Sequence, residues 1–127
     1  MRKKIVTMLV GLLFVGALCA LEHHAVKHHT SEALHEAAQL LDALRGGDLE
    51  AGMRMAKEMD ATWDEWAQGL EMMIDHGSTD EVRFALSRLI AALEGDDRAS
   101  ALIYASELEG CIEHLCDRQA VSLQNLL

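Results

Sequence analysis

The sequence contains no proline and few aromatic residues, since Trp, Tyr and Phe together make up 4% of its 127 residues. Strands are enriched in aromatic and β-branched side chains, and proline interrupts helices, so both scarcities favour helix over sheet. Ala, Leu, Met and Glu, which favour helix, are abundant instead. The composition therefore predicts an all-α protein, and a chain of this length is expected to form one domain.

Positive charge is also scarce, because 11 Lys and Arg residues stand against 21 Asp and Glu residues, for a formal net charge of -10. Arg2, Lys3 and Lys4 contribute three of the positive charges, so the rest of the chain carries a net charge of -13. This charge repels phosphate backbones and argues against nucleic acid as a partner. Solubility, or a cationic partner, accounts for it.

The three cysteines form no disulfide pattern. Cys19 lies in an apolar segment, and Cys111 and Cys116 are five positions apart on an expected helix. Five helical residues turn through about 140°, so the two side chains point to different faces. We expect Cys111 and Cys116 to be free thiols.

The N-terminus has the pattern of a membrane segment. Arg2, Lys3 and Lys4 precede an apolar run over residues 5–21, which Glu22 ends. As a helix, the run would span about 26 Å, slightly less than the roughly 30 Å hydrocarbon core of a bilayer. It is typical of a signal anchor or a signal peptide, and the basic residues place the N-terminus in the cytoplasm and residues 22–127 outside it.

We expect this segment to be retained as a single-pass anchor in the cytoplasmic membrane, with secretion after cleavage as the alternative. Ala20 is small enough to precede a cleavage site, but Leu18, two positions earlier, departs from the usual small residue. The same Leu18 stands before Cys19, where a lipidated cysteine would need a small neighbour.

The rest of the chain matches itself without gaps at an offset of 49 positions. The identical pairs are Thr30 and Thr79, Glu32 and Glu81, Leu40 and Leu89, Ala43 and Ala92, Leu44 and Leu93, Gly46 and Gly95, Asp48 and Asp97, Ala56 and Ala105, and Glu58 and Glu107. This pattern predicts a duplicated helical hairpin.

Each copy, over about 30–76 and 79–127, predicts a helix, a glycine-containing turn and a second helix capped by Asp48 or Asp97. A glycine would supply the left-handed residue of each turn, and Ser78 and Glu81 have capping-box spacing at the start of the second copy. We expect an antiparallel four-helix bundle over 30–127, with a tetratricopeptide-like stack of hairpins as the alternative.

The order of motifs resembles the bacterial domain-of-unknown-function family 4363. The resemblance rests on the Trp63-x-x-Trp66 pair, on Met73-Ile74-Asp75-His76, and on the ending Ser122-Leu123-Gln124-Asn125-Leu126-Leu127, all behind a basic and apolar anchor. It implies a short, membrane-anchored helical protein, as found largely in Firmicutes, with no established activity. This sequence has Gly77-Ser78-Thr79 where the family usually continues with acidic residues and an Ile.

Histidines make the densest cluster of chemically active side chains, at His23, His24, His28 and His29. His24 and His28 lie one helical turn apart and would offer two ligands to zinc, nickel or copper. A closed zinc site normally takes four ligands, so the alternative is a mobile, solvated linker over 22–29 whose histidines titrate with pH.

Two further motifs are interpreted as structural. Trp63 and Trp66 share a helix face with apolar neighbours, which favours packing over a role as a ligand platform. Asp75 and His76 resemble an acid–base pair, but no nucleophile or third ligand accompanies them in sequence. We expect them to form a hydrogen-bonded latch between the hairpins.

The sequence therefore predicts a non-enzymatic module without a cofactor, tethered to the cytoplasmic membrane through residues 5–21 and acting by protein–protein contacts at its outer face. The family resemblance implies a membrane protein as partner, because members are often encoded beside a small multispanning membrane protein. The alternative function is metal binding in the cell envelope by His23, His24, His28 and His29.

Overall fold

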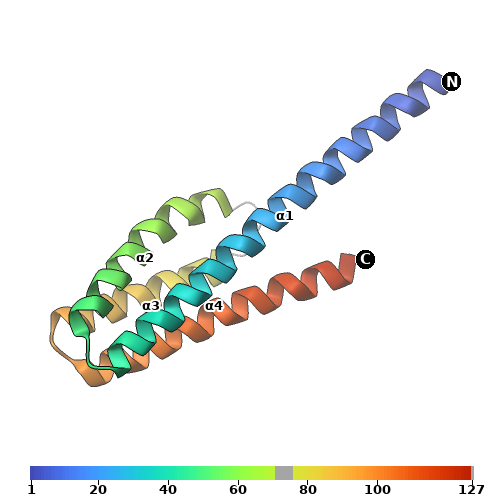
Figure 1. Ribbon diagram of the computed structural model, residues 1–127. Coiled ribbons are helices and arrows are strands. Elements are labelled where there is room, and N and C mark those ends of the chain that lie inside the picture. The colour runs from blue at the N-terminus through green and yellow to red at the C-terminus, as the bar shows by residue number, and fades with distance from the viewer. Residues whose placement is uncertain (71–75, 127) are drawn as a thin grey trace.

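The computed structural model describes residues 1–70 and 76–126, and of residues 69, 70, 76 and 119–126 it describes the backbone alone. The described residues form four α-helices and no strand: α1 (Arg2–Arg45), α2 (Leu49–Leu70), α3 (His76–Glu94) and α4 (Arg98–Leu126). The all-α fold expected from the composition is confirmed (Figure 1).

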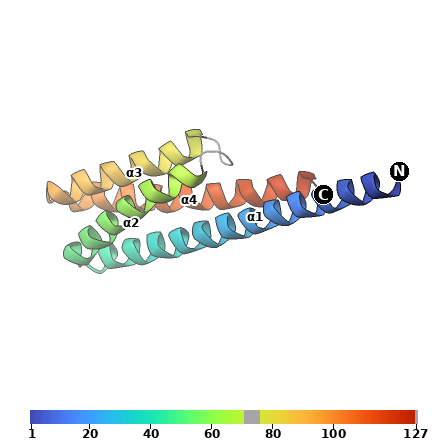
Figure 2. The same ribbon diagram turned by 90° about the horizontal axis from the view of Figure 1, so that it is seen from above.

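The helices run alternately up and down, so that each is antiparallel to the next (Figures 1 and 2). Within the described chain, α1 packs against α2, α2 against α3, and α3 against α4. Helix α4 also packs against α1, which closes the array into a bundle. The chain therefore forms the closed four-helix bundle that we expected, and the open stack of hairpins does not describe it.

Helix α1 runs without interruption from the N-terminal arm into the bundle. The expectation of a mobile linker over residues 22–29 is wrong, because this stretch lies inside α1. Neither glycine nor proline occurs between Gly16 and Gly46, so no residue favours a break. Val26 and Thr30 are already buried, which shows that bundle packing begins within the histidine-rich stretch.

The two hairpin turns repeat each other in atomic detail. In the first, the amide of Gly47 donates to the carbonyl of Leu44 (3.1 Å) and that of Asp48 to Ala43 (3.0 Å). In the second, the residues 49 positions later form the same two bonds, at 3.2 and 2.9 Å. Both turns are Schellman motifs, and they confirm the duplication of the turn.

The left-handed residue of each turn follows the glycine that ends the preceding helix. It is Gly47 in the first copy, with φ of 84°, and Asp96 in the second, with φ of 53°. The expectation that glycine supplies this residue is therefore wrong for the second turn. The expected caps are present, since Asp48 Oδ1 accepts from the amide of Ala51 and Asp97 Oδ1 from that of Ser100, each at 3.1 Å.

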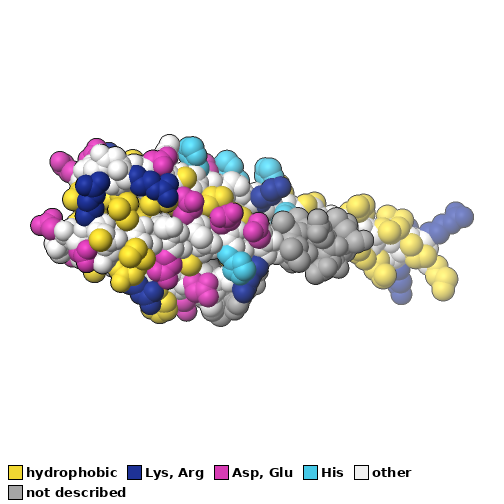
Figure 3. Space-filling model, turned by 90° about the horizontal axis from the view of Figure 1, so that it is seen from below, with side chains coloured by type: hydrophobic (Ala, Val, Ile, Leu, Met, Phe, Trp, Pro, Cys, Tyr) yellow, Lys and Arg dark blue, Asp and Glu magenta, His cyan; other side chains and the backbone are white. Residues whose placement is uncertain are grey.

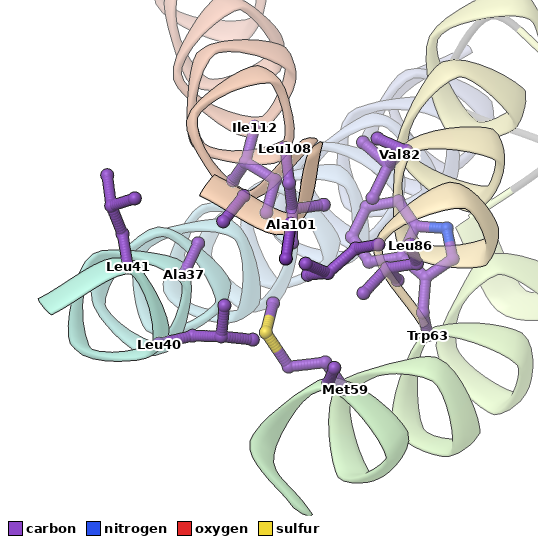
Figure 4. Close-up of a cluster of buried hydrophobic side chains, with 14 of the residues drawn as sticks. Ala37, Leu40, Leu41, Met59, Trp63, Val82, Leu86, Ala101, Leu108 and Ile112 are labelled. Carbon is purple, nitrogen blue, oxygen red and sulfur yellow. The ribbon is translucent and has the colours of Figure 1, made fainter. Parts of the chain in front are cut away.

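Aliphatic side chains from all four helices fill the interior (Figure 4). Small residues alternate with leucines, so that helices approach closely at alanines and interdigitate at the larger side chains. The side chains buried completely, at 0% exposure, are Ala37, Leu40, Leu44, Ala56, Ala67, Val82, Leu86, Leu89, Ala101, Ala105, Leu108 and Ile112. Trp63 enters this core from α2, and its indole N–H donates to the carbonyl of Thr79 in α3 (3.3 Å).

Residues 1–22 are exposed, and the N-terminal part of α1 extends beyond the other helices as an arm (Figures 1 and 3). Apolar side chains cover most of the part of the arm that is visible in Figure 3, whereas charged side chains are spread over the bundle surface in the same view. By length and composition α1 is able to cross a membrane, a test that signal sequences also meet. The arm therefore has the length and composition of a membrane anchor or a signal segment.

Candidate functional site: a groove between helices α1 and α2

The histidine cluster lies along α1 where the arm enters the bundle. His28 Nε2 lies 3.2 Å from Glu32 Oε1, and His29 Nδ1 lies 3.9 Å from Glu32 Oε2. His24 is exposed and His23 half-buried on the same helix. The helix thus directs two of the four histidines toward one carboxylate.

The structure gives the metal-binding alternative no support. Among the residues it describes, no group of three or more His, Cys, Asp or Glu side chains is placed to hold a metal ion. His29 instead presents its ring to Trp66, with 5.7 Å between ring centroids and a tilt of 64°. The cluster joins α1 to α2 through an aromatic contact.

The tryptophan pair is divided between the core and the surface. Trp63 is 3% exposed, whereas Trp66 is half-buried and packs against the edge of the core. Their ring centroids are 4.7 Å apart at an interplanar angle of 61°, an edge-to-face arrangement that aromatic rings favour. The sequence spacing places both rings on one face of α2, but it does not show that Trp63 is buried and Trp66 only half-buried. That difference depends on how α1 and α3 pack against this face.

A groove follows the seam between α1 and α2, beginning beside Trp66. Its first part is lined from α1 by His29, Glu32, Ala33 and Glu36, and from α2 by Met59, Thr62, Trp63 and Trp66. Its second part shares Glu36, Met59 and Thr62, and continues toward the turn along Gln39, Arg54, Met55 and Glu58. We call the two parts together the α1–α2 groove.

The groove has an apolar floor and a charged rim. Met59 is 5% exposed and Met55 is half-buried at the floor, while Glu32, Glu36 and Glu58 are exposed at the rim with Arg54. Three carboxylates against one guanidinium leave the rim negative. Such a surface suits a ligand with an apolar side and positive charge rather than a small anion.

The remaining motif residues contribute little to the description of a site. Asp75 lies outside the described residues, so the expected latch with His76 is untested. His76 begins α3 and Asn125 lies near the end of α4, with only their backbones described. Helix α3 begins before Ser78, so Ser78 does not cap it; Ser78 Oγ instead accepts a bond from Arg118 Nη1 at 2.9 Å.

The sequence did not predict that two threonines would be buried as part of the structure. Thr30 and Thr79 are each 1% exposed, and they are equivalent in the duplication. Thr30 Oγ1 donates to the carbonyl of Val26 at 2.9 Å, and the carbonyl of Thr79 accepts the bond from Trp63. Their identity at the offset of 49 was the available signal, although these two bonds differ: Thr30 donates from its side chain, whereas Thr79 accepts at its main-chain carbonyl.

All three cysteines are free in the part of the chain that the structure describes, as expected for Cys111 and Cys116. Partial burial raises the pKa of both thiols, and the nearby Glu81 and Glu107 carboxylates raise that of Cys111 further. A hydrogen bond with Thr30 opposes the effect of burial at Cys116. Both side chains are therefore poor nucleophiles at neutral pH.

The model of the domain-of-unknown-function family DUF4363 matches residues 20–126. This chain belongs to DUF4363. The match begins at the end of the apolar run and covers the whole bundle, including the tryptophan pair and both turns. No curated protein and no solved structure matches the chain. The description of DUF4363 carries no activity, so the function has to be argued from the fold and its surfaces.

Proposed function

We propose that this DUF4363 protein is a non-enzymatic helical module, tethered to the cytoplasmic membrane and making protein–protein contacts at its outer face. The observation that carries the proposal is the arm of α1. Its large apolar side chains are exposed, although aliphatic side chains elsewhere fill the bundle core. A bilayer is the environment in which such a helix end is stable.

Charge supports the orientation. Arg2, Lys3 and Lys4 precede the apolar run, and positive residues are retained on the cytoplasmic side. The bundle then lies outside the cytoplasm, and its negative charge keeps it away from anionic lipid headgroups. Because α1 continues from the arm into the bundle, the bundle is held in a fixed orientation rather than on a flexible linker.

The contact role is supported by the α1–α2 groove, which offers an apolar floor at the bundle surface. The catalytic alternative has less support, since the two half-buried thiols are disfavoured as nucleophiles by the rise in their pKa. Binding a partner protein at the membrane surface is the simplest function that uses both the apolar arm and the α1–α2 groove.

Location is tested first, in cells that express the full chain. Alkaline extraction of membranes should leave the protein in the pellet, and protease added outside intact spheroplasts should digest the bundle. Mass spectrometry of the purified chain should find the peptide before Ala20. A protein recovered in the medium without that peptide would instead establish secretion.

Interaction is tested by affinity purification from membranes solubilised in mild detergent. The control is the first 29 residues fused to an unrelated soluble domain, which keeps the arm and removes the bundle. A membrane protein enriched with the full chain and absent with the control supports the proposal. Equal recovery with both baits would show that the bundle makes no stable contact.

A further inference from the structure

The α1–α2 groove differs from the rest of the bundle surface in the side chains that form its floor. Met55 and Met59 line it beside the half-buried ring of Trp66. Methionine adapts its shape to a bound side chain, and Trp supplies a large rigid contact area, so the combination suits insertion of an apolar residue. Met59 belongs to the buried core and is 5% exposed, so Met55 and Trp66 supply most of the accessible apolar surface.

The rim determines the charge of what fits. Glu32, Glu36 and Glu58 are exposed along the groove and face solvent on both sides of the floor. When an apolar side chain of a ligand enters between these carboxylates, Lys or Arg residues beside it in the ligand are attracted to the rim. The floor and the rim together select an amphipathic and positively charged segment.

On the proposed function, we infer that the α1–α2 groove binds a cationic amphipathic peptide segment of the partner protein. The segment places apolar side chains against Met55 and Trp66, above the buried Met59, and its Lys or Arg side chains against the rim carboxylates. Grooves between two helices commonly receive a third helix in this way. The length of α1 from His29 to Gln39, about 15 Å, accommodates roughly three turns of such a helix.

Charge argues against two other occupants. A second copy of this chain brings a domain with the same net charge of -13 behind its basic N-terminus, so the two bundles repel each other. A membrane surface with anionic headgroups is repelled for the same reason. A partner segment rich in Lys or Arg is attracted.

The position of the groove also restricts the partner. His29 lies eight positions after Leu21, the last apolar residue of the arm, which places the near end of the groove about 12 Å along the helix from the end of the arm. The far end at Gln39 lies about 15 Å beyond that. The partner segment must therefore be presented within the first few nanometres outside the bilayer.

Binding is measured with the full chain in nanodiscs of zwitterionic lipid and with empty nanodiscs as reference. The probe is a 14-residue synthetic helix of Leu and Lys with all Leu on one face, and the same helix with Glu for Lys is the control peptide. Tryptophan emission reports binding, because neither peptide contains Trp. We expect saturable binding of the Lys peptide and none of the Glu peptide.

Matched variants separate a groove from general attraction to an acidic protein. Glu32→Gln with Glu36→Gln removes two charges from the rim, and Glu113→Gln with Asp117→Asn removes two exposed charges from α4, outside the groove. We expect the first pair to weaken binding of the Lys peptide about 3- to 10-fold and the second pair to change it less than 2-fold. Equal weakening by both pairs would overturn the inference.

The affinity purification distinguishes this inference from the proposed function on which it rests. If the full chain captures a membrane protein and the Glu32→Gln, Glu36→Gln variant captures it equally well, the module interacts but not through this groove. If the full chain captures nothing beyond the anchor control, the proposed function itself fails. A captured partner without a cationic amphipathic segment outside the membrane also counts against the groove.

Discussion

Gly47 and Asp96 occupy the same position in two copies of one turn, and both hold a positive φ, at 84° and 53°. Each residue follows the glycine that ends a helix, and each is followed by the aspartate that caps the next helix. Glycine adopts this conformation without a steric cost, whereas a side chain at Cβ is disfavoured. The second copy therefore forms the turn with the less suitable residue.

Substitutions at this pair should have opposite effects. Asp96→Gly should raise the free energy of unfolding by about 0.5–1 kcal/mol, and Gly47→Ala should lower it by about 1–2 kcal/mol. Gly46→Ala is the control, because Gly46 has φ of -73° and a Cβ there meets only ordinary contacts. Urea unfolding of the full chain in detergent, followed by circular dichroism, measures all three. A destabilised Asp96→Gly would show that the Asp96 side chain matters more than its backbone.

The tryptophan pair should differ in its contribution to stability. Trp63→Ala should cost about 3–5 kcal/mol, because the ring is 3% exposed and fills space between α2 and α3. Trp66→Ala should cost about 1–2 kcal/mol, because its ring is only half-buried. The same unfolding measurement compares them, and equal losses would contradict the division between core and surface.

A milder change isolates the hydrogen bond of Trp63. Trp63→Phe keeps an aromatic ring but leaves the carbonyl of Thr79 without the indole N–H that now lies 3.3 Å away. The free energy of unfolding should fall less than in Trp63→Ala. The lost hydrogen bond should account for about 1 kcal/mol of the decrease. Trp66→Phe is the matched control, and it should be close to wild type.

Local rules predict the all-helical fold and the position of both hairpin turns, but they do not predict Asp96 as the left-handed residue or the start of α3 before Ser78. Asp48 and Asp97 were recognised as caps because a short carboxylate at the end of a glycine turn has one common use. The continuity of α1 was not recognised, since a basic-to-apolar-to-polar pattern indicates a membrane segment without showing how it joins a domain. The absence of Gly and Pro from residues 17–45 was the relevant local signal.

The groove was beyond prediction from the sequence for a different reason. Met55, Met59 and Trp66 could be placed on one helix, but whether that helix leaves them open depends on how α1 packs beside it. His29 and Trp66 are distant in sequence, and only the crossing of α1 and α2 brings their rings within 5.7 Å. Side chains from one helix can be assigned to a face, whereas contacts between helices require the tertiary structure.

The cap at Asp97 should make stability depend on acid. Bonds from the Ser100 side chain and then its amide lower the pKa of Asp97 below the ordinary 3.8. A lowered pKa stabilises the folded chain at pH above 3.8, and the contribution is lost as pH falls through the folded value. Ser100→Ala removes the first of these bonds and brings the folded pKa nearer to 3.8, so the acid-dependent loss of stability should be smaller and should be complete at a higher pH than in wild type. Acid unfolding curves compare the two, with Glu113→Gln as the control; coincident curves for wild type and Ser100→Ala would contradict the assignment.

The half-buried thiols of Cys111 and Cys116 should react slowly with alkylating reagents. Burial raises the pKa of each above the ordinary 9.0, and only the thiolate is nucleophilic. The pH at which alkylation by iodoacetamide becomes fast should therefore be higher in the folded chain than in urea, for both residues.

Because the folded chain binds these protons more tightly than the unfolded chain, its stability should also decrease as pH rises above 9. Mass spectrometry of the two peptides measures each rate separately, and Cys111→Ser with Cys116→Ser should abolish the loss of stability due to these groups. Equal alkylation profiles in the folded and unfolded chain would show that both thiols are exposed, and would contradict the burial of Cys111 and Cys116 beside the core.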